Sequence, residues 1–260
     1  MRAIFDKFKA HVIFILMTIL SMILLTTTAI SDSEVWLEAA QENQPSNICH
    51  DNPVVIEEKV HESYQIKISS AGDGFCHLID IERQGRSLYH DEEIGGHFFF
   101  GANWQKEIKP LSDLTGEGNT DLLISKWTGG AHCCFSFHIF RLGSAFKKIA
   151  NIDGGNYYPF FKDIDYDGIP EVEVMDDFLA GLFSSFAHSV TGDVVLKYSN
   201  DGYRVAAEHM KKTAPDLSSM NKEVRFWKKM LLKRGDSDWP PPSLIQAVTS
   251  LIFTGNKRAA

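Results

Sequence analysis

One short stretch carries acidic side chains at the spacing that holds a hard cation. Between two apolar runs, carboxylates occupy positions one, three, five and nine of a nine-residue segment: Asp163, Asp165, Asp167 and Glu171. Ca²⁺ takes six to eight oxygen ligands, which such a loop supplies from side chains and one backbone carbonyl, here that of Ile169. Gly168, at position six, allows the positive φ that turns the chain back towards the ion. We therefore expect a calcium loop at 163–171.

Two other interpretations of this stretch are weaker. An EF-hand needs a glutamate at position twelve, where this chain has Val174. The residues after Gly168 also alternate between apolar and acidic, which predicts a strand rather than a helix. A solvated turn rich in Asp and Gly is the simpler alternative. Against it, four carboxylates within nine residues repel one another unless a cation or protons intervene.

A second copy of the spacing lies fifty residues earlier. Its ligand positions match those of 163–171 at one constant offset and are Asp113, Thr115, Glu117, Asn119 and Asp121. Because Thr115 replaces one carboxylate and Glu117 lengthens another, we expect this copy to bind an ion more weakly. A fixed period of 40–50 residues is the size of one propeller blade, so the period indicates a repeat architecture.

Both segments resemble the FG-GAP or VCBS-type repeats, the calcium-loop repeats also seen in integrin alpha-chain propellers. The residues that match the acidic positions of that family are Asp113, Asp121, Asp163, Asp165 and Asp167, whereas Thr115, Glu117 and Glu171 depart from its usual Asp or Asn. The stretch Thr128–Cys134, with Gly-Gly-Ala-His-Cys-Cys, and the stretch Ile252–Gly255 resemble a group of exported bacterial repeat proteins without an assigned activity. The resemblance covers about residues 105–255 and implies Ca²⁺ as the bound ion.

The N-terminus has the order of a secretory signal peptide. Arg2, Lys7 and Lys9 precede the apolar run Val12–Leu25, and small residues follow. We expect a signal peptide at 1–31 and a polar leader at 32–47, which places the mature protein in the periplasm or outside the cell. The alternative is an uncleaved membrane anchor, because Val12–Ile30 is nearly long enough to span a bilayer.

Charge is unevenly distributed along the chain. Between Asp32 and Ala207 there are 28 acidic and 13 basic residues, whereas between Glu208 and Arg234 there are 3 acidic and 8 basic residues. The acidic part argues against nucleic-acid binding, which needs a basic surface. We expect the basic segment either to dock on the acidic part or to be a solvated face.

The middle of the chain has the pattern of antiparallel β-structure. Strand-like stretches occur at 64–68, 75–81, 87–90, 97–104, 135–140, 172–175, 194–198 and 203–206, with turn signals at Gln84-Gly85 and at 200–202. A complete propeller needs four to eight blades. The 176 residues from Asp32 to Ala207 supply about three and a half. We therefore predict an incomplete, propeller-like or sandwich-like β-domain at 48–207.

Residues 208–260 have helical periodicity and predict a two-helix cap. After Pro215 an apolar stripe recurs at Leu217, Met220, Val224, Trp227 and Leu231, with lysine and arginine on most of the remaining surface. Ser243 and Gln246 have the spacing of a capping box for a second helix, which Gly255 ends. We expect both helices to bury their apolar faces against the sheet.

Four cysteines in an exported chain predict disulfides, with three possible pairings. Strand alternation would let Cys133 and Cys134 each reach Cys49 or Cys76. Adjacent Cα atoms lie about 3.8 Å apart, so a strained vicinal bridge is also possible. The exported group that the chain resembles contains the adjacent pair without the other two cysteines. That resemblance favours Cys49–Cys76 together with a vicinal bridge.

Two functions of different classes follow. The first is an exported calcium-binding β-repeat protein without a catalytic site, a binding module for a protein or glycan of the cell envelope or exterior. Its membrane contact would be limited to an uncleaved N-terminal segment. The alternative is a secreted hydrolase or a thiol or metal redox protein that uses His132, Cys133 and Cys134. Paired zinc-ligand spacings and the common nucleophile and nucleotide fingerprints are absent from the sequence.

Overall fold

The computed structural model describes residues 48–50, 52–131, 133–199, 201–234, 240–257 and 259. The signal peptide and the polar leader predicted at 1–47 lie outside these residues, as does His132. The side chains of Ile48, Cys133 and Arg234 are also outside the described part.

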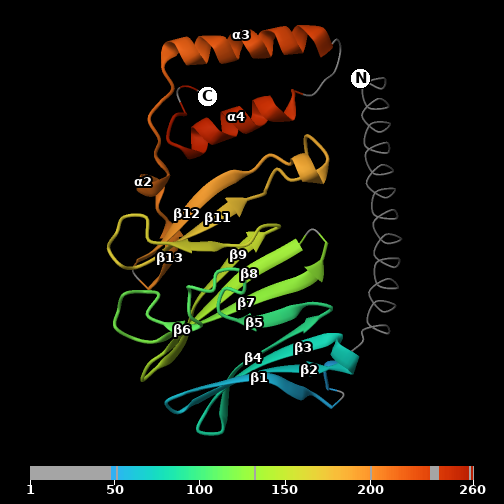
Figure 1. Cartoon of the computed structure of the whole chain (residues 1–260), viewed down its shortest axis with the longest axis vertical. Helices are drawn as coiled ribbons and strands as arrows, with labels where there is room; N and C mark the ends of the chain where they lie inside the picture. Colours follow the sequence, from blue (N-terminus) through green and yellow to red (C-terminus); the bar gives the residue numbers. More distant parts are fainter. Residues whose placement is uncertain are drawn as a thin grey trace, which may run out of the picture. The chain divides into compact units, whose positions relative to one another are not determined.

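The described strands form three antiparallel sheets (Figure 1). Sheet 1 contains β1 (Val54–His61), β2 (Tyr64–Ala71), β3 (Cys76–Arg83) and β4 (Arg86–Ile94). Sheet 2 contains β5 (His97–Phe100), β6 (Leu111–Ser112), β7 (Asp121–Gly130), β8 (Cys133–Leu142) and β9 (Phe146–Gly155). Sheet 3 contains β10 (Phe160–Lys162), β11 (Glu171–Asp176), β12 (Gly192–Ser199) and β13 (Gly202–Val205). The prediction of a mainly antiparallel β-protein is confirmed.

In sheets 1 and 3 the strands lie side by side in chain order, whereas in sheet 2 both β5 and β6 pair with β7. The clearest turn joins β3 to β4, where Gln84 and Gly85 have φ angles of 52° and 76°. Two consecutive positive φ angles are the signature of the two-residue hairpin turn that matches the twist of the strands. The described strands form no closed barrel or propeller.

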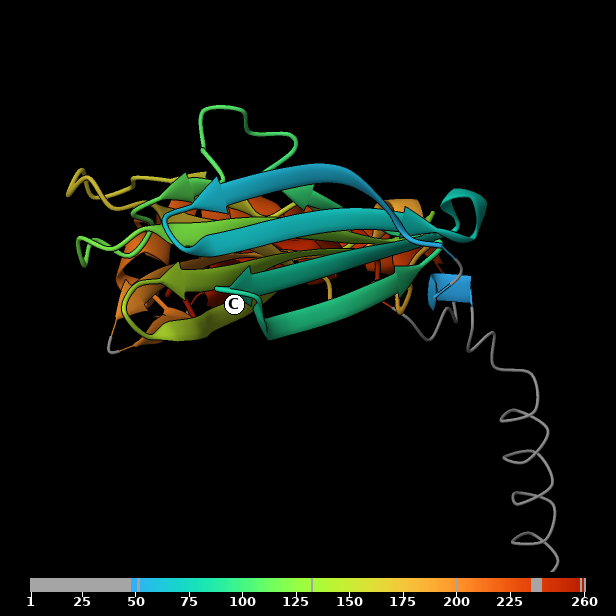
Figure 2. The same cartoon turned by 90° about the horizontal axis from the view of Figure 1, so that it is seen from below.

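Sheet 2 lies between the other two sheets and buries both of its faces (Figure 1). Seen from below, the strands of sheet 1 lie in front of the other sheets (Figure 2). Alternation along β7 directs Leu122 and Ile124 towards sheet 1 and Leu123 towards sheet 3, and all three are at most 1% exposed. On β8, Phe137 stacks on Phe161 of sheet 3 with ring centroids 5.1 Å apart. Two apolar cores on opposite faces of one sheet thus hold the three sheets together.

The Gly-Gly part of the stretch Thr128–Cys134 has a packing role. Gly129 has a φ of 82°, and a Cβ at this position would collide with the carbonyl of Gly95. A Cβ at Gly96 would likewise collide with the carbonyl of Trp127. The backbone after β4 therefore crosses the end of β7 at a distance that only glycine permits.

Helical segments follow sheet 3 or lie in loops. The α-helices are α2 (Ala207–Met210), α3 (Leu217–Arg234) and α4 (Pro242–Phe253), and the 3-10 turns are η1 (Ile48–His50), η2 (Gly72–Gly74) and η3 (Phe186–His188). Helices α2 and α4 pack against β12 (Figure 1). Helix α3 does not pack on a sheet, so the expectation that its apolar stripe is buried there is wrong: Leu217 is 77% exposed and Leu231 43%. Helix α4 already covers the face of sheet 3 against which α3 was expected to pack.

The capping box predicted at Ser243 is also wrong. Helix α4 begins at Pro242 without a side-chain cap. The amide of Gln246 instead binds the backbone of Thr191 in both directions, donating to its carbonyl at 2.8 Å and accepting from its N–H at 3.0 Å. The side chain of Gln246 therefore forms a tertiary contact instead of the helix cap that the local sequence pattern predicted.

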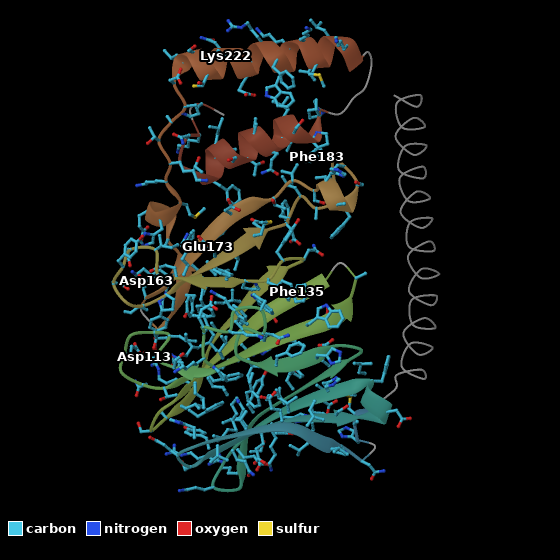
Figure 3. All side chains as sticks on the ribbon, viewed as in Figure 1. Asp113, Phe135, Asp163, Glu173, Phe183 and Lys222 are labelled. Carbon is cyan, nitrogen blue, oxygen red and sulfur yellow. A yellow bond between two sulfur atoms is a disulfide. The ribbon has the colours of Figure 1, made fainter. Side chains whose placement is uncertain are left out.

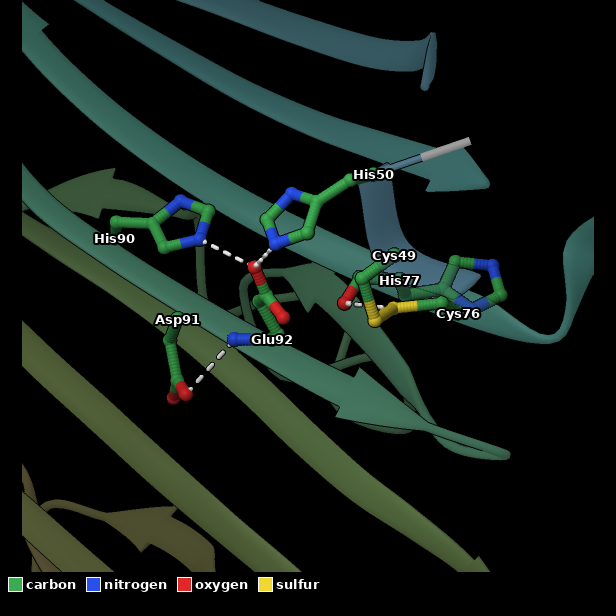
Figure 4. Close-up of a disulfide and its surroundings, with 7 residues drawn as sticks. All are labelled: Cys49, His50, Cys76, His77, His90, Asp91 and Glu92. Atoms are coloured by element: carbon green, nitrogen blue, oxygen red, sulfur yellow. Dashed lines mark hydrogen bonds and ion pairs between the residues drawn. A yellow bond between two sulfur atoms is a disulfide. The ribbon is translucent and has the colours of Figure 1, made fainter. Parts of the chain in front are cut away.

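The predicted disulfide between Cys49 and Cys76 is confirmed (Figure 4). Its Cα atoms are 5.3 Å apart, and both residues are buried where η1 meets β3. Beside it, Glu92 lies between His90, at 2.9 Å, and His50, at 3.8 Å. Cys134 is also disulfide-bonded, and no described cysteine is free. The vicinal bridge to Cys133 stays a prediction.

Candidate metal centre

The two predicted calcium loops occupy equivalent places in sheets 2 and 3. We call residues 113–121 the first loop and residues 163–171 the second loop. The first joins β6 to β7 and the second joins β10 to β11. The flanking pairs also match at the offset of fifty: Leu111 with Leu122 and Ser112 with Asp121 in sheet 2, Phe161 with Val172 and Lys162 with Glu171 in sheet 3. Asp113 and Asp163 accordingly lie on the same side of neighbouring sheets (Figure 3).

The aspartate at position one shapes each loop. The carboxylate of Asp113 accepts backbone hydrogen bonds from Gly116 at 2.7 Å and from Gly118 at 2.8 Å. Asp163 accepts bonds from Asp167 at 3.1 Å and from Gly168 at 3.0 Å, which correspond to those that Asp113 accepts from Glu117, at 3.2 Å, and from Gly118. Gly118 and Gly168 have φ angles of 75° and 87°, as the sequence predicted for position six. The turn is therefore closed by the chain's own amides.

The acidic residue at position nine is fully buried in both loops. Oδ2 of Asp121 accepts hydrogen bonds from the N–H of Leu114 at 3.0 Å and from the N–H and hydroxyl of Thr115 at 3.1 and 2.9 Å. Its other oxygen, Oδ1, is buried and has no hydrogen-bond partner among the described residues. Burial raises the pKa of Asp121, because ionisation there costs desolvation energy. Oδ1 of Asp121 is thus an uncompensated acceptor that a cation would satisfy.

In the second loop a lysine of the protein lies among the carboxylates. Nζ of Lys197, on β12, is 2.5 Å from Asp165 Oδ2, 2.7 Å from Asp167 Oδ2 and 3.0 Å from Glu171 Oε1. The hydrogen bonds to Asp165 and Asp167 raise the pKa of Lys197, and Lys197 in turn lowers the pKa of Asp167. Nε2 of His209 lies 3.5 Å from Asp165 Oδ2. The ammonium group of Lys197 therefore supplies part of the positive charge that we expected a bound cation to supply to these carboxylates.

The first loop faces a basic residue at the equivalent position. Arg141 pairs with Asp121 across β7 and β8, and Lys197 follows Leu196, the partner of Val172 across β11 and β12. The guanidinium of Arg141 forms an ion pair with Glu117 and donates to the hydroxyl of Tyr198 at 2.6 Å. Neither basic residue was predicted from the sequence, because each lies on the neighbouring strand and reaches its loop only through the strand register.

The remaining predicted ligands are gathered in the second loop but not in the first. Asp163, Asp165 and Asp167 form one group whose oxygens lie within 4.8 Å of one another, and Asp165, Glu171 and His209 form a second. In the first loop, the carboxylate of Glu117 is held by Arg141 rather than by the loop. The side chains of Asn119 and Ile169 lie at position seven, where a loop of this type offers its backbone carbonyl. Ile169 also packs against Gly116, so the two loops touch.

The donor set of both loops fits a hard divalent cation. Carboxylate, hydroxyl and carbonyl oxygens are the ligands that Ca²⁺ prefers, and neither loop contains a cysteine. In the first loop the open acceptor is Asp121 Oδ1. In the second loop the carboxylates are already gathered, and an ion would have to displace Lys197.

A separate cleft of about 540 Å³ lies between sheet 3 and helices α2 and α4. Its apolar side is lined by Tyr157, Phe160 and Phe253, and carboxylates of Glu173 and Asp193 reach its edge. Its volume lies within the range of small-molecule sites. This cleft was not predictable from the sequence, because sheet 3 and α4 meet only through tertiary packing.

A buried polar cluster lies between sheets 1 and 2 around His138. Nδ1 of this histidine is 3.3 Å from the Tyr89 hydroxyl and 3.3 Å from Lys148 Nζ, and Nε2 is 3.4 Å from the Ser136 hydroxyl. Burial, followed by the nearby charge of Lys148, lowers the pKa of His138 to about 4. The imidazole is therefore neutral at physiological pH and serves as a hydrogen-bonding group within the core.

Comparisons with known proteins identify one distant relative. The chain is 28% identical over 142 residues to the uncharacterized protein y4bJ of Sinorhizobium fredii, a match that covers 53% of this chain and 22% of the relative. The chain thus corresponds to less than a quarter of that protein's length. No family model matches the chain. No solved structure matches it either. Of the helices in the described part, none combines the length and apolar character needed to cross a bilayer.

Proposed function

We propose that this chain is an exported, non-catalytic binding module in which Ca²⁺ stabilises the first and second loops, as in FG-GAP or VCBS-type repeats. The observation that carries the proposal is Oδ1 of Asp121, a fully buried carboxylate oxygen without a hydrogen-bond partner in the described part of the chain. Leaving a buried acceptor unsatisfied costs about 1–3 kcal/mol, and more when it is charged. A cation coordinated by this oxygen would remove that cost.

The repeat interpretation extends to the sheets. We infer that each sheet is a blade-like unit and that the three units form an incomplete, propeller-like array. Supporting this, successive sheets pack face to face, and the two loops recur at the same strand register. Within this scaffold the ion is a structural component, because it ties the start of β7 or β11 to the preceding loop.

The cleft beside sheet 3 is the proposed binding surface. Aromatic rings beside carboxylates suit a glycan or a protein segment of the cell envelope or exterior, because rings stack on apolar faces and carboxylates accept hydrogen bonds from hydroxyl or amide groups. Ca²⁺ at the second loop would support this surface through β11, which follows the loop and lines the cleft at Glu173.

Titration calorimetry of chelator-treated protein with Ca²⁺ tests the proposal. We expect saturable binding, together with a melting temperature that rises with Ca²⁺ and less with Mg²⁺, which needs a smaller octahedral shell. A hundredfold excess of ligand over its Kd stabilises the native state by about 2.7 kcal/mol. Equal melting temperatures in Ca²⁺ and in EDTA would refute the calcium assignment.

The alternative as a thiol enzyme can be tested on the same sample. A thiol or soft-metal mechanism requires a reduced cysteine. No described cysteine is free, and the alternative therefore lacks a supporting observation in the described residues. Titration of the native protein with a thiol reagent distinguishes the two functions: we expect no reactive thiol, whereas two would favour the enzyme.

A further inference from the structure

Helix α3 carries an apolar stripe in which Met220 and Trp227 are half-buried and the other members are exposed. Met220, Val224, Trp227 and Leu231 recur at intervals of three or four residues, which places them on one face of the helix. Val224 is 48% exposed and Leu231 43%, and Leu217 extends the stripe at the N-terminal end. From Leu217 to Leu231 the stripe is about 21 Å long at 1.5 Å per residue. Single exposed apolar residues are normal on a protein surface, whereas a contiguous row of this length is typical of a contact site.

The rest of α3 is mainly basic, although Phe226 and Leu232 are also exposed outside the stripe. The helix contains one glutamate and six lysine or arginine residues, a net charge of +5. At about 100° per residue, Lys228 lies beside the stripe, Arg225 lies farther round the helix, and Lys222 and Lys229 lie opposite the stripe. Residues 48–207, by contrast, contain 24 acidic and 13 basic residues. Among the described residues, no basic side chain of α3 forms an ion pair with this acidic part.

The helix is formed and anchored without a partner. Asp216 caps its N-terminus, because Oδ1 accepts from the N–H of Ser218 at 2.8 Å and of Ser219 at 3.0 Å. The segment before it is held to the end of α4, where Lys212 donates to the carbonyl of Thr254 at 3.2 Å and Asn256 donates to the carbonyl of Lys212 at 3.1 Å. A preformed helix loses little conformational entropy when it binds.

The partner of α3 must suit both its apolar stripe and its basic side chains. A symmetric pairing of α3 with α3 of a second copy would bring two helices of net charge +5 together, which costs electrostatic energy. An acidic peptide or a nucleic acid would satisfy the lysines but offers no apolar layer for Trp227 and Val224. An anionic lipid surface satisfies both, because acyl chains cover the stripe and headgroups pair with the basic side chains.

We propose that α3 lies in the interface of a membrane that contains anionic lipids, with the stripe Met220–Leu231 facing the acyl chains. Arg225 and Lys228 reach the headgroups with their flexible stems. The acidic body stays in the aqueous phase, because the anionic surface repels it. This contact is independent of the N-terminal apolar segment and of Ca²⁺ binding.

Vesicle co-sedimentation of the full chain tests the proposal. Vesicles of phosphatidylcholine alone are compared with vesicles that also contain phosphatidylglycerol. The apolar variant is Val224→Asp/Leu231→Asp, and its matched control is Leu182→Asp, an exposed leucine outside α3. The charge variant is Arg225→Glu/Lys228→Glu, and its matched control is Lys106→Glu/Lys109→Glu, at exposed positions of the acidic part. All variants retain the N-terminal segment, so differences among them report on α3.

We expect the wild-type chain to bind the anionic vesicles at least about tenfold more strongly than the neutral ones. Both α3 variants should lose this difference, whereas both controls should keep it. Equal binding by wild type and α3 variants would overturn the proposal. It would also be overturned if sedimentation without vesicles showed a dimer that Val224→Asp/Leu231→Asp converts to a monomer, because a second copy would then cover the stripe.

Discussion

Nζ of Lys197 lies 3.0 Å from Oε1 of Glu171, the fully buried acidic residue at position nine of the second loop. The same ammonium group contacts Asp165 and Asp167, so one lysine neutralises part of the charge of three carboxylates. Arg141 faces Asp121 at the equivalent register of sheet 2. A tethered cation beside each loop offsets part of the acidic charge without an ion. Under the proposed calcium binding, Ca²⁺ would have to compete with this cation.

Lys197→Met should strengthen Ca²⁺ binding by the second loop by about tenfold or more, because the ion no longer has to displace an ammonium group. In EDTA the same variant should melt at a lower temperature, since its carboxylates lose their counter-charge, and Ca²⁺ should restore stability. Calorimetric titration and thermal melting measure both effects. Lys162→Met, which removes a lysine paired with Glu173 on the neighbouring strand, is the matched control. Unchanged affinity in Lys197→Met would show that the lysine does not compete with the ion.

Asp121→Asn should stabilise the chelator-treated protein at neutral pH by about 1–2 kcal/mol, because it replaces a buried charge by a neutral amide. The amide oxygen can keep the bonds from Leu114 and Thr115, and the amide nitrogen takes the place of Oδ1. Denaturant unfolding in EDTA measures the change. The variant should also abolish the Ca²⁺ response of the first loop. Asp113→Asn is the control, and it should destabilise, because its carboxylate accepts several loop amides.

The raised pKa of Asp121 also predicts a pH dependence. In the folded protein the carboxyl of Asp121 stays protonated to a higher pH than in the unfolded chain, where its pKa is near 3.8. The contribution of Asp121 to stability is therefore present below pH 3.8 and is lost as pH rises through the folded pKa. Stability curves of wild type and Asp121→Asn, measured in EDTA, should diverge over this range. Parallel curves would show that ionisation of Asp121 does not lower the stability of the folded protein.

His138 should make the protein sensitive to acid in a different range. Its pKa is lowered from 6.5 to about 4 in the folded state, so the unfolded chain binds a proton that the folded chain does not. This contribution to stability is full above pH 6.5 and is lost as pH falls towards 4, by an amount on the order of 3 kcal/mol. Denaturant unfolding of His138→Asn should lack this part of the slope. His188→Asn, at an exposed position, is the control and should keep it.

Removal of the Cys49–Cys76 disulfide should lower the free energy of unfolding by about 2–4 kcal/mol, because the bridge closes a loop in the unfolded chain. Its cysteines are 27 residues apart in sequence and join η1 to β3. Cys49→Ser/Cys76→Ser retains Cys133 and Cys134, and its denaturation midpoint measures the loss. A midpoint equal to that of wild type would show that the core of sheet 1 holds the N-terminal segment without the bridge.

Features that depend on neighbouring residues were predictable from the sequence. The positions of β2, β8 and β12, the hairpin at Gln84-Gly85 and the positive φ of Gly168 follow from alternation and from local backbone sterics, which act over a few residues. The constant offset between the two loops was likewise visible in the sequence, because identical turns need identical residue spacing.

Features that depend on which distant surfaces meet were decided by tertiary packing. Lys197 and Glu171 are brought together by the register of β11 and β12, and no pattern within either segment encodes that register. Gln246 binds Thr191 instead of capping α4, because packing places a backbone pair within its reach. The stripe of α3 was visible in the sequence, but its exposure was not. Amphipathic periodicity specifies that a face is apolar, whereas only the arrangement of the other elements specifies what covers it.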